Sequence, residues 1–158
     1  MRRIAPLIFI VATACESPST APGPTAESAA PAASASPAER AAQCRDVLAV
    51  VVRAADESKA ITDHITGDGT QSLEKLSASA KKAREDVKKI TVTDAAVAGA
   101  RDRYADMLAK MSGAASEVVA AARAQEFDKL EEANGTLTKA VESEPALVEG
   151  IRQACASP

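Results

Sequence analysis

Histidine, methionine and cysteine are the side chains of this sequence that could bind a transition metal. Their number and spacing restrict the kinds of metal site that could form. His64 is the single histidine, so neither a multi-histidine zinc site nor a di-iron site with two Glu-x-x-His motifs can form. Met107 and Met111 lie four residues apart, as two soft ligands for copper(I) would, but this spacing is more typical of core methionines. If His64 ends a helix beside an antiparallel neighbour, it lies about 20 Å from Met111, too far for a shared haem iron. We therefore expect no metal and no cofactor.

Catalytic side chains show no recognisable arrangement either. The sequence has no glycine-rich phosphate loop and no serine, cysteine or histidine in a nucleophile setting, and we expect its acidic residues on outward helix faces. Cys44 and Cys155 lack the Cys-x-x-Cys spacing of redox-active pairs. The chain carries 19 Lys and Arg against 22 Asp and Glu, with two Phe, one Tyr and no Trp. This composition favours neither phosphate contacts nor base stacking. We expect no enzymatic activity and no nucleic-acid partner.

Two polar features have alternative interpretations. Lysines and an arginine cluster between Lys81 and Lys89, a pattern that could face anionic lipid. Two acidic residues interrupt the cluster, so a solvated helix face is the favoured interpretation. Asn134 falls on the predicted apolar stripe of the last helix. A buried asparagine at such a position can fix helix register, and it can also mark a small ligand cavity; a surface position is the third alternative.

The first 15 residues have the pattern of an export signal. Arg2 and Arg3 form a positive start, and residues 4–14 follow without a charge. This run has the length of a signal-peptide core, whereas a membrane span needs about 20 apolar residues. The segment Ala12-Thr13-Ala14-Cys15 then resembles the lipobox of bacterial lipoprotein precursors, in which a branched apolar residue and two small residues precede a lipid-accepting cysteine. The sequence departs from that pattern at Ala12, where leucine is usual.

The resemblance implies that residues 1–14 are a lipoprotein signal peptide and that Cys15 carries the lipid that anchors the chain to a membrane of the bacterial cell envelope. Ordinary secretory cleavage after the small residues is the alternative. Cysteine parity favours lipidation, because the two remaining cysteines can then pair with each other. Glu16 is not the aspartate associated with inner-membrane retention in enteric bacteria, which favours the outer membrane if the host is Gram-negative.

Residues 15–37 form a separate segment in composition. Beyond Cys15 they are nearly all alanine, proline, serine and threonine, and such a stretch cannot bury enough apolar surface to offset its chain entropy. The sequence therefore predicts a disordered tether. Its proline content favours semi-extended chain of up to about 3.1 Å per residue, which would hold a domain tens of ångströms from the membrane.

Residues 38–158 predict one all-α domain. Apolar residues recur three and four positions apart over 38–64, 70–90, 94–125 and from 126 or 127 to the last residues, which predicts four helices. The short connections predict an antiparallel up-down-up-down four-helix bundle. Thr93 is the expected N-cap of the third helix. Pro145 interrupts the fourth, which we expect to be kinked or split there, with Ser143 as the cap of its second part.

Such a bundle brings the start of its first helix beside the end of its last. Cys44 and Cys155 occupy those two places, and export would expose them to an oxidising compartment, so the sequence predicts a disulfide between them. The chain as a whole is predicted to be a non-enzymatic interaction or structural module, tethered to a membrane and with a protein partner in the cell envelope. The alternative is a ligand-sensing or carrier bundle, similar in outline to the periplasmic sensor domains of chemoreceptors, with a pocket near Asn134 and Pro145.

Overall fold

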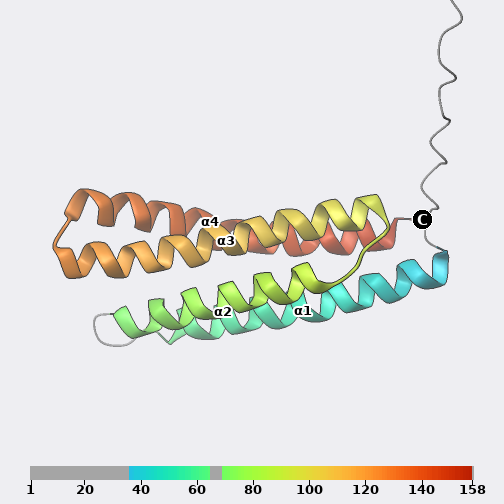
Figure 1. Ribbon diagram of the computed structural model, residues 1–158, viewed down its shortest axis with the longest axis horizontal. Coiled ribbons are helices and arrows are strands. Elements are labelled where there is room, and N and C mark those ends of the chain that lie inside the picture. Colours follow the sequence, from blue (N-terminus) through green and yellow to red (C-terminus); the bar gives the residue numbers. More distant parts are fainter. Residues whose placement is uncertain (1–35, 65–68, 158) are drawn as a thin grey trace, which may run out of the picture. The chain divides into compact units, whose positions relative to one another are not determined.

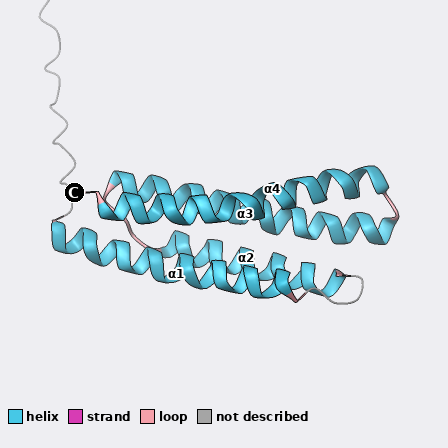
Figure 2. Cartoon of the chain, turned by 180° about the vertical axis from the view of Figure 1, so that it is seen from behind, coloured by secondary structure: helices cyan, strands magenta, loops and turns pink. Residues whose placement is uncertain are grey.

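The computed structural model describes residues 36–64 and 69–157. The predicted signal peptide, the predicted lipidation site Cys15 and all but the last two residues of the predicted tether lie outside these ranges. The described residues contain four helices and no strand, namely α1 (Pro37–Asp63), α2 (Thr70–Lys89), α3 (Ala95–Ala124) and α4 (Phe127–Ala156) (Figures 1 and 2). The prediction of an all-α, four-helix domain is confirmed, with helix boundaries within one or two residues of those expected.

Local sequence explains where the first two helices begin. The Ser36 hydroxyl accepts a hydrogen bond from the backbone N–H of Glu39, and the Glu39 carboxylate accepts one from the backbone N–H of Ser36 at 2.8 Å. This reciprocal pair satisfies two N–H groups that the helix itself leaves free, while Pro37 fits the first helical turn. The α2 helix follows Gly69, whose φ of 75° lies in the left-handed region that glycine enters without strain.

The α3 helix begins one residue later than the sequence predicts. Asp94 is its N-cap, with a side-chain oxygen that accepts from the Val97 N–H at 3.0 Å. The assignment of Thr93 as the cap is therefore wrong. Thr93 instead makes two hydrogen bonds with the Gln43 side chain of α1, one through its N–H and one through its hydroxyl. Asp94 is the stronger cap because its charged carboxylate also interacts favourably with the positive end of the helix dipole.

The four helices pack in chain order, each antiparallel to the next (Figures 1 and 2). Contacts are most extensive between α3 and α4 and between α2 and α3, whereas α1 packs on α2 and only sparsely on α4. The stripe predicted for α3 is buried throughout, and a second row is buried beside it because α3 lies against two neighbours. The buried residues are Val97, Ala100, Tyr104, Ala105, Met107, Leu108, Met111, Ala114, Ala115, Val118, Val119 and Ala121.

Small side chains allow α2 and α3 to approach closely. The Ser77 hydroxyl donates to the Ser112 carbonyl at 2.9 Å, and the Ser112 hydroxyl donates to the Ser77 carbonyl at 3.0 Å. The hydroxyl of Ser77 also lies 2.7 Å from that of Ser116. These reciprocal contacts satisfy the serine hydroxyl groups at the seam between the two helices.

The α4 helix is continuous through Pro145. Of the two expected alternatives, a kink or a split, the split is therefore excluded and the kink stays a prediction. The Ser143 hydroxyl does not cap a new helix but donates to the Ala140 carbonyl of the preceding turn at 2.8 Å. Proline lacks the N–H that would bond the carbonyl of Val141. Pro145 is exposed, so this carbonyl lies on the solvent side of the helix, where water can replace the missing donor.

Candidate functional site

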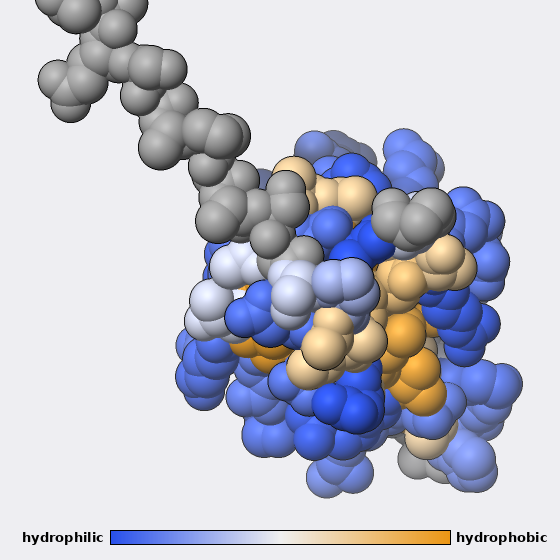
Figure 3. Space-filling model, turned by 90° about the vertical axis from the view of Figure 1, so that its right-hand side faces the viewer, coloured by the Kyte–Doolittle hydropathy of each residue, from blue (hydrophilic) through white to orange (hydrophobic). Residues whose placement is uncertain are grey.

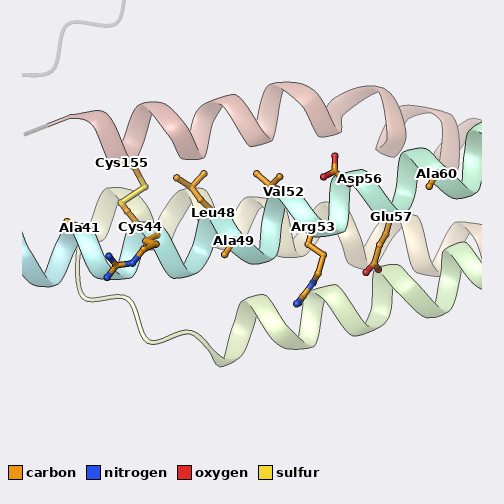
Figure 4. A pocket seen from close by; sticks show the side chains of 11 residues that line it. Ala41, Cys44, Leu48, Ala49, Val52, Arg53, Asp56, Glu57, Ala60 and Cys155 are labelled. Atoms are coloured by element: carbon orange, nitrogen blue, oxygen red, sulfur yellow. A yellow bond between two sulfur atoms is a disulfide. The ribbon is translucent and has the colours of Figure 1, made fainter.

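A covalent link closes one end of the bundle. Cys44 of α1 and Cys155 of α4 lie at disulfide-bonding distance, with their Cα atoms 5.7 Å apart and a sequence separation of 111 (Figure 4). The predicted pairing of these two cysteines is thus confirmed in geometry. In the chain-entropy description, a disulfide that closes so long a loop stabilises the folded state by about 4–5 kcal/mol.

Arg40 adds polar links at the same end. Its Nε lies 3.0 Å from a carboxylate oxygen of Asp94, the N-cap of α3, and its Nη2 donates to the Ala154 carbonyl of α4 at 2.7 Å. The side chains of Arg40 and Asp94 are 16% and 22% exposed, so solvent screens this ion pair less than a fully exposed one. One arginine therefore joins the starts of α1 and α3 to the end of α4, beside the disulfide.

The structure does not bring together the residues considered for metal binding. His64 is exposed at the end of α1, with Nδ1 2.9 Å from the Ala60 carbonyl. Met107 and Met111 are buried in the core, as their spacing predicts. Over residues 36–64 and 69–157, no group of three or more His, Cys, Asp and Glu side chains is placed to hold a metal ion. Within the same ranges no helix is long and apolar enough to cross a membrane.

Asn134 is exposed rather than buried. The buried row of α4 passes through Ala133, Leu137 and Ala140. Leu137 matches the predicted stripe, whereas Ala133 and Ala140 are buried in place of the predicted Asn134 and Val141. Register fixation by a buried asparagine is therefore excluded. Asn134 does line a cavity of about 390 Å³ between the end of α1, the start of α2 and the middle of α4, whereas Pro145 does not.

A buried carboxylate is the main polar feature that the sequence analysis missed. The expectation that all acidic residues face outward is wrong for Glu144, which is only 7% exposed. Its place in the buried row is visible in the spacing Leu137, Ala140, Glu144, Val148 and Ile151, each three or four residues from the last. Among the described residues, Ser58 and Glu144 are polar residues whose side chains are buried in the core.

Tyr104 is the principal partner of Glu144. Its hydroxyl donates to a Glu144 carboxylate oxygen at 2.9 Å and lies 3.3 Å from the Val51 carbonyl. Burial raises the pKa of Glu144, although hydrogen bonds from Tyr104 and Ser58 oppose the rise. Burial, together with the adjacent Glu144 charge, also raises the pKa of Tyr104. Tyr104 therefore stays protonated and acts as a hydrogen-bond donor that holds α4 to α3 and α1.

The Tyr104–Glu144 pair is closed to solvent. Tyr104 is completely buried, and the neighbouring Ser58 hydroxyl, itself buried, lies 3.8 Å from the Met111 sulfur. The polar side-chain groups of Tyr104, Glu144 and Ser58 have partners inside the protein. The geometry is that of a structural hydrogen-bond network in the core.

An open groove follows the outer face of α1. We call this surface the α1 face (Figure 4). Leu48 and Val52 lie near its centre, and Val52 is 38% exposed, which is unusual for an apolar residue in the middle of a packed helix. Apart from Cys155, the lining comes from α1 alone. Its α1 residues are Ala41, Cys44, Arg45, Leu48, Ala49, Val52, Arg53, Asp56, Glu57 and Ala60.

Four charged side chains border the α1 face. Two of them already have partners on α2, since Arg53 lies 3.4 Å from the Asp86 carboxylate and Glu57 accepts from the Ser79 hydroxyl. Arg45 and Asp56 form no ion pair and no hydrogen bond with any residue that the structure describes. The α1 face therefore combines an apolar centre with two unpaired charges of opposite sign.

The end of the bundle at which α1 begins has a different character. Hydrophilic side chains cover most of it, and hydrophobic ones show in the recesses between them (Figure 3).

Comparisons of the chain with protein-family models, with curated proteins and with solved structures find no match.

Proposed function

We propose that this chain is a bacterial envelope lipoprotein, held at a membrane by a lipid on Cys15, and that its helical bundle is a non-enzymatic protein-interaction or structural module. The observation that carries the anchor is the pairing of Cys44 with Cys155. In an oxidising compartment an unpaired cysteine needs an explanation, and this pairing leaves Cys15 alone. Lipidation within the segment Ala12–Cys15, which resembles a lipobox, supplies that explanation.

The polar links at one end of the bundle fit this role. The tether would enter the bundle at Ser36, and α1 begins at once with a reciprocal cap. A few residues further on, Arg40 and Cys44 join α1 to α4. A load applied through the tether would therefore reach α4 directly, through a covalent bond, instead of unwinding α1 alone. We infer that these links hold the domain together at its point of attachment.

The α1 face supports the interaction role. Helix-in-groove recognition uses an apolar stripe with a spacing of three or four residues and charged residues at its border. The outer side of α1 has this pattern, and Val52 remains exposed at its centre. An apolar centre with a polar rim is also the usual anatomy of a protein–protein interface.

Membrane fractionation tests the anchor. We expect the full chain to be found with the membranes and the Cys15→Ser variant to be lost from them, because the lipid is the proposed attachment. The double variant Cys44→Ser/Cys155→Ser is the matched control, since it removes two cysteines and leaves Cys15, and it should remain with the membranes. Equal membrane association of Cys15→Ser and the unaltered chain would refute the anchor.

A carrier or ligand-sensing bundle is the second candidate, and the cavity lined by Asn134 favours it. Apolar side chains of α1, α2 and α4 surround this cavity, and Asn134 and Glu142 are among its polar lining residues. Native mass spectrometry of the full chain, mildly extracted from its membrane, tests this candidate. A reproducible small adduct that Asn134→Leu abolishes would support a carrier, whereas a chain without adduct would exclude it.

A further inference from the structure

The α1 face has a two-fold pattern in its residue types. If α1 is laid against an antiparallel copy of itself with the midpoint between Val50 and Val51, every α1 residue of the face lies opposite another residue of the face. Ala41 then faces Ala60, and Ala49 faces Val52. Alanines thus meet at both ends of the contact, and one member of each central pair is an alanine, which lets two helices approach closely.

The unpaired charges follow the same symmetry. Arg45 and Asp56 are about 16 Å apart along the helix axis, so they cannot pair within one chain. In the antiparallel arrangement Arg45 of each copy lies opposite Asp56 of the other. Each charge that lacks a partner among the described residues would therefore gain one of opposite sign, twice in each dimer.

From this geometry we propose that the α1 face docks a second copy of this chain, with the two α1 helices antiparallel about a two-fold axis near Val50 and Val51. The proposal deepens the interaction role given above and rests on it, because it names the partner of that surface. A closed two-fold contact uses the same patch on both subunits. It covers Leu48 and Val52, and it places the aliphatic part of Arg53 against Leu48 of the other copy.

Charge complementarity selects a second copy over an unrelated partner. An unrelated helix would need an acid and a base at matching positions, whereas the sequence of α1 already provides both at the required separation. The antiparallel direction is equally specific. In a parallel pair with the same residues aligned, Arg45 would face Arg45 and Asp56 would face Asp56, and like charges in an interface disfavour association.

Charge reversal on two differently tagged forms of the full chain tests the proposal. Both forms are co-expressed, extracted in mild detergent and purified through one tag, and recovery of the other tag is measured. In Arg45→Glu and in Asp56→Arg, both cross-subunit pairs become repulsive. When both tagged forms carry the same single variant, recovery of the second tag should therefore fall to about a tenth of the unaltered level or less. Lys75→Glu is the matched control, because Lys75 is exposed on α2 outside the α1 face.

Rescue provides the decisive part of the test. When Arg45→Glu is co-expressed with Asp56→Arg, both pairs across the two-fold axis again join opposite charges, and recovery should return to the unaltered level. The double variant Arg45→Glu/Asp56→Arg should behave likewise with itself. Circular dichroism of the purified variants verifies that each is folded, which is expected for changes at exposed positions.

Three results would overturn the proposal. They are an unaltered chain that does not recover its second tagged form, single variants that recover themselves as well as the unaltered chain does, and a mixed pair without rescue. Membrane fractionation of the same cells separates this failure from failure of the anchor. A chain that stays with the membranes without self-recovery refutes the dimer alone, and a chain that leaves the membranes refutes the anchor.

Discussion

Removal of the Tyr104 hydroxyl should weaken the bundle through one buried hydrogen bond. Tyr104→Phe keeps the aromatic ring in the core but takes away the donor that lies 2.9 Å from Glu144 and 3.3 Å from the Val51 carbonyl. Leaving a buried acceptor without its donor costs about 1–3 kcal/mol, with the larger values for a charged acceptor. With a denaturant dependence of about 1–3 kcal/mol per molar urea, the unfolding midpoint should fall by about 1 M.

The loss should depend on pH in a defined direction. Because burial raises the pKa of Glu144 above its ordinary value of 4.5, the folded chain keeps a proton that the unfolded chain has already released. The free energy of unfolding therefore decreases as pH rises from 4.5 through the folded pKa, and this contribution is constant above it. The Tyr104 hydrogen bond lowers this pKa, so the cost of Tyr104→Phe should be larger above the folded pKa of Glu144, where the acceptor is charged, than at about pH 4, where it is protonated.

Urea unfolding followed by circular dichroism at both pH values measures this difference. Glu144→Gln is the matched control, because an amide does not titrate in this range and still offers an oxygen to Tyr104. In the Glu144→Gln background the cost of Tyr104→Phe should be the same at both pH values. A cost that is larger at about pH 4, or a pH dependence that persists in this background, would refute the assignment of Glu144 as the titrating partner.

Three further changes test other parts of the structure. Reduction of the Cys44–Cys155 disulfide should lower the free energy of unfolding by about 4–5 kcal/mol, measured by urea unfolding with and without reductant; an unchanged midpoint would contradict the long-loop stabilisation. Asp94→Ala should cost at least about 1 kcal/mol, because it removes both the α3 cap and the ion pair with Arg40, whereas Asp102→Ala, at an exposed position within the same helix, should cost much less in the same assay. Pro145→Ala should raise the midpoint of thermal unfolding, because it restores the missing backbone donor. Alanine is favoured over proline inside a helix by up to about 3 kcal/mol, and a lower midpoint would contradict this reasoning.

Apolar spacing predicts most of this fold because the helices are long and their connections short. The stripe of α3 is a clear example, since each predicted position from Val97 to Ala121 is buried. The disulfide followed from the same reasoning, because bundle topology alone brings Cys44 and Cys155 to one end. These predictions needed only the helical period and the chain order.

The errors arise where a polar residue competes with the apolar pattern. In α4 the predicted positions Leu137, Val148 and Ile151 are buried, but Ala133 and Ala140 are buried in place of their predicted neighbours Asn134 and Val141. Glu144 was missed because a glutamate in a core is rare unless it has a partner. That partner, Tyr104, is 40 residues away in sequence, and their proximity is a tertiary contact that no local pattern specifies.

The open α1 face also lies beyond local patterns. The sequence shows that α1 has apolar residues, but which of them remain exposed depends on how closely α4 approaches. Leu48 was placed on the predicted stripe and is partly buried, whereas Val52, outside that stripe, is left exposed. Only the relative packing of α1 and α4 reveals this surface.

The intact mass of the full chain, recovered from its own membrane without reductant, tests the central proposal most directly. We predict a chain that begins at Cys15, carries acyl chains on that residue, and lacks the two hydrogen atoms lost when Cys44 and Cys155 pair. A mass that retains residues 1–14, or that shows Cys15 unmodified, would contradict the lipid anchor on which the proposed function depends.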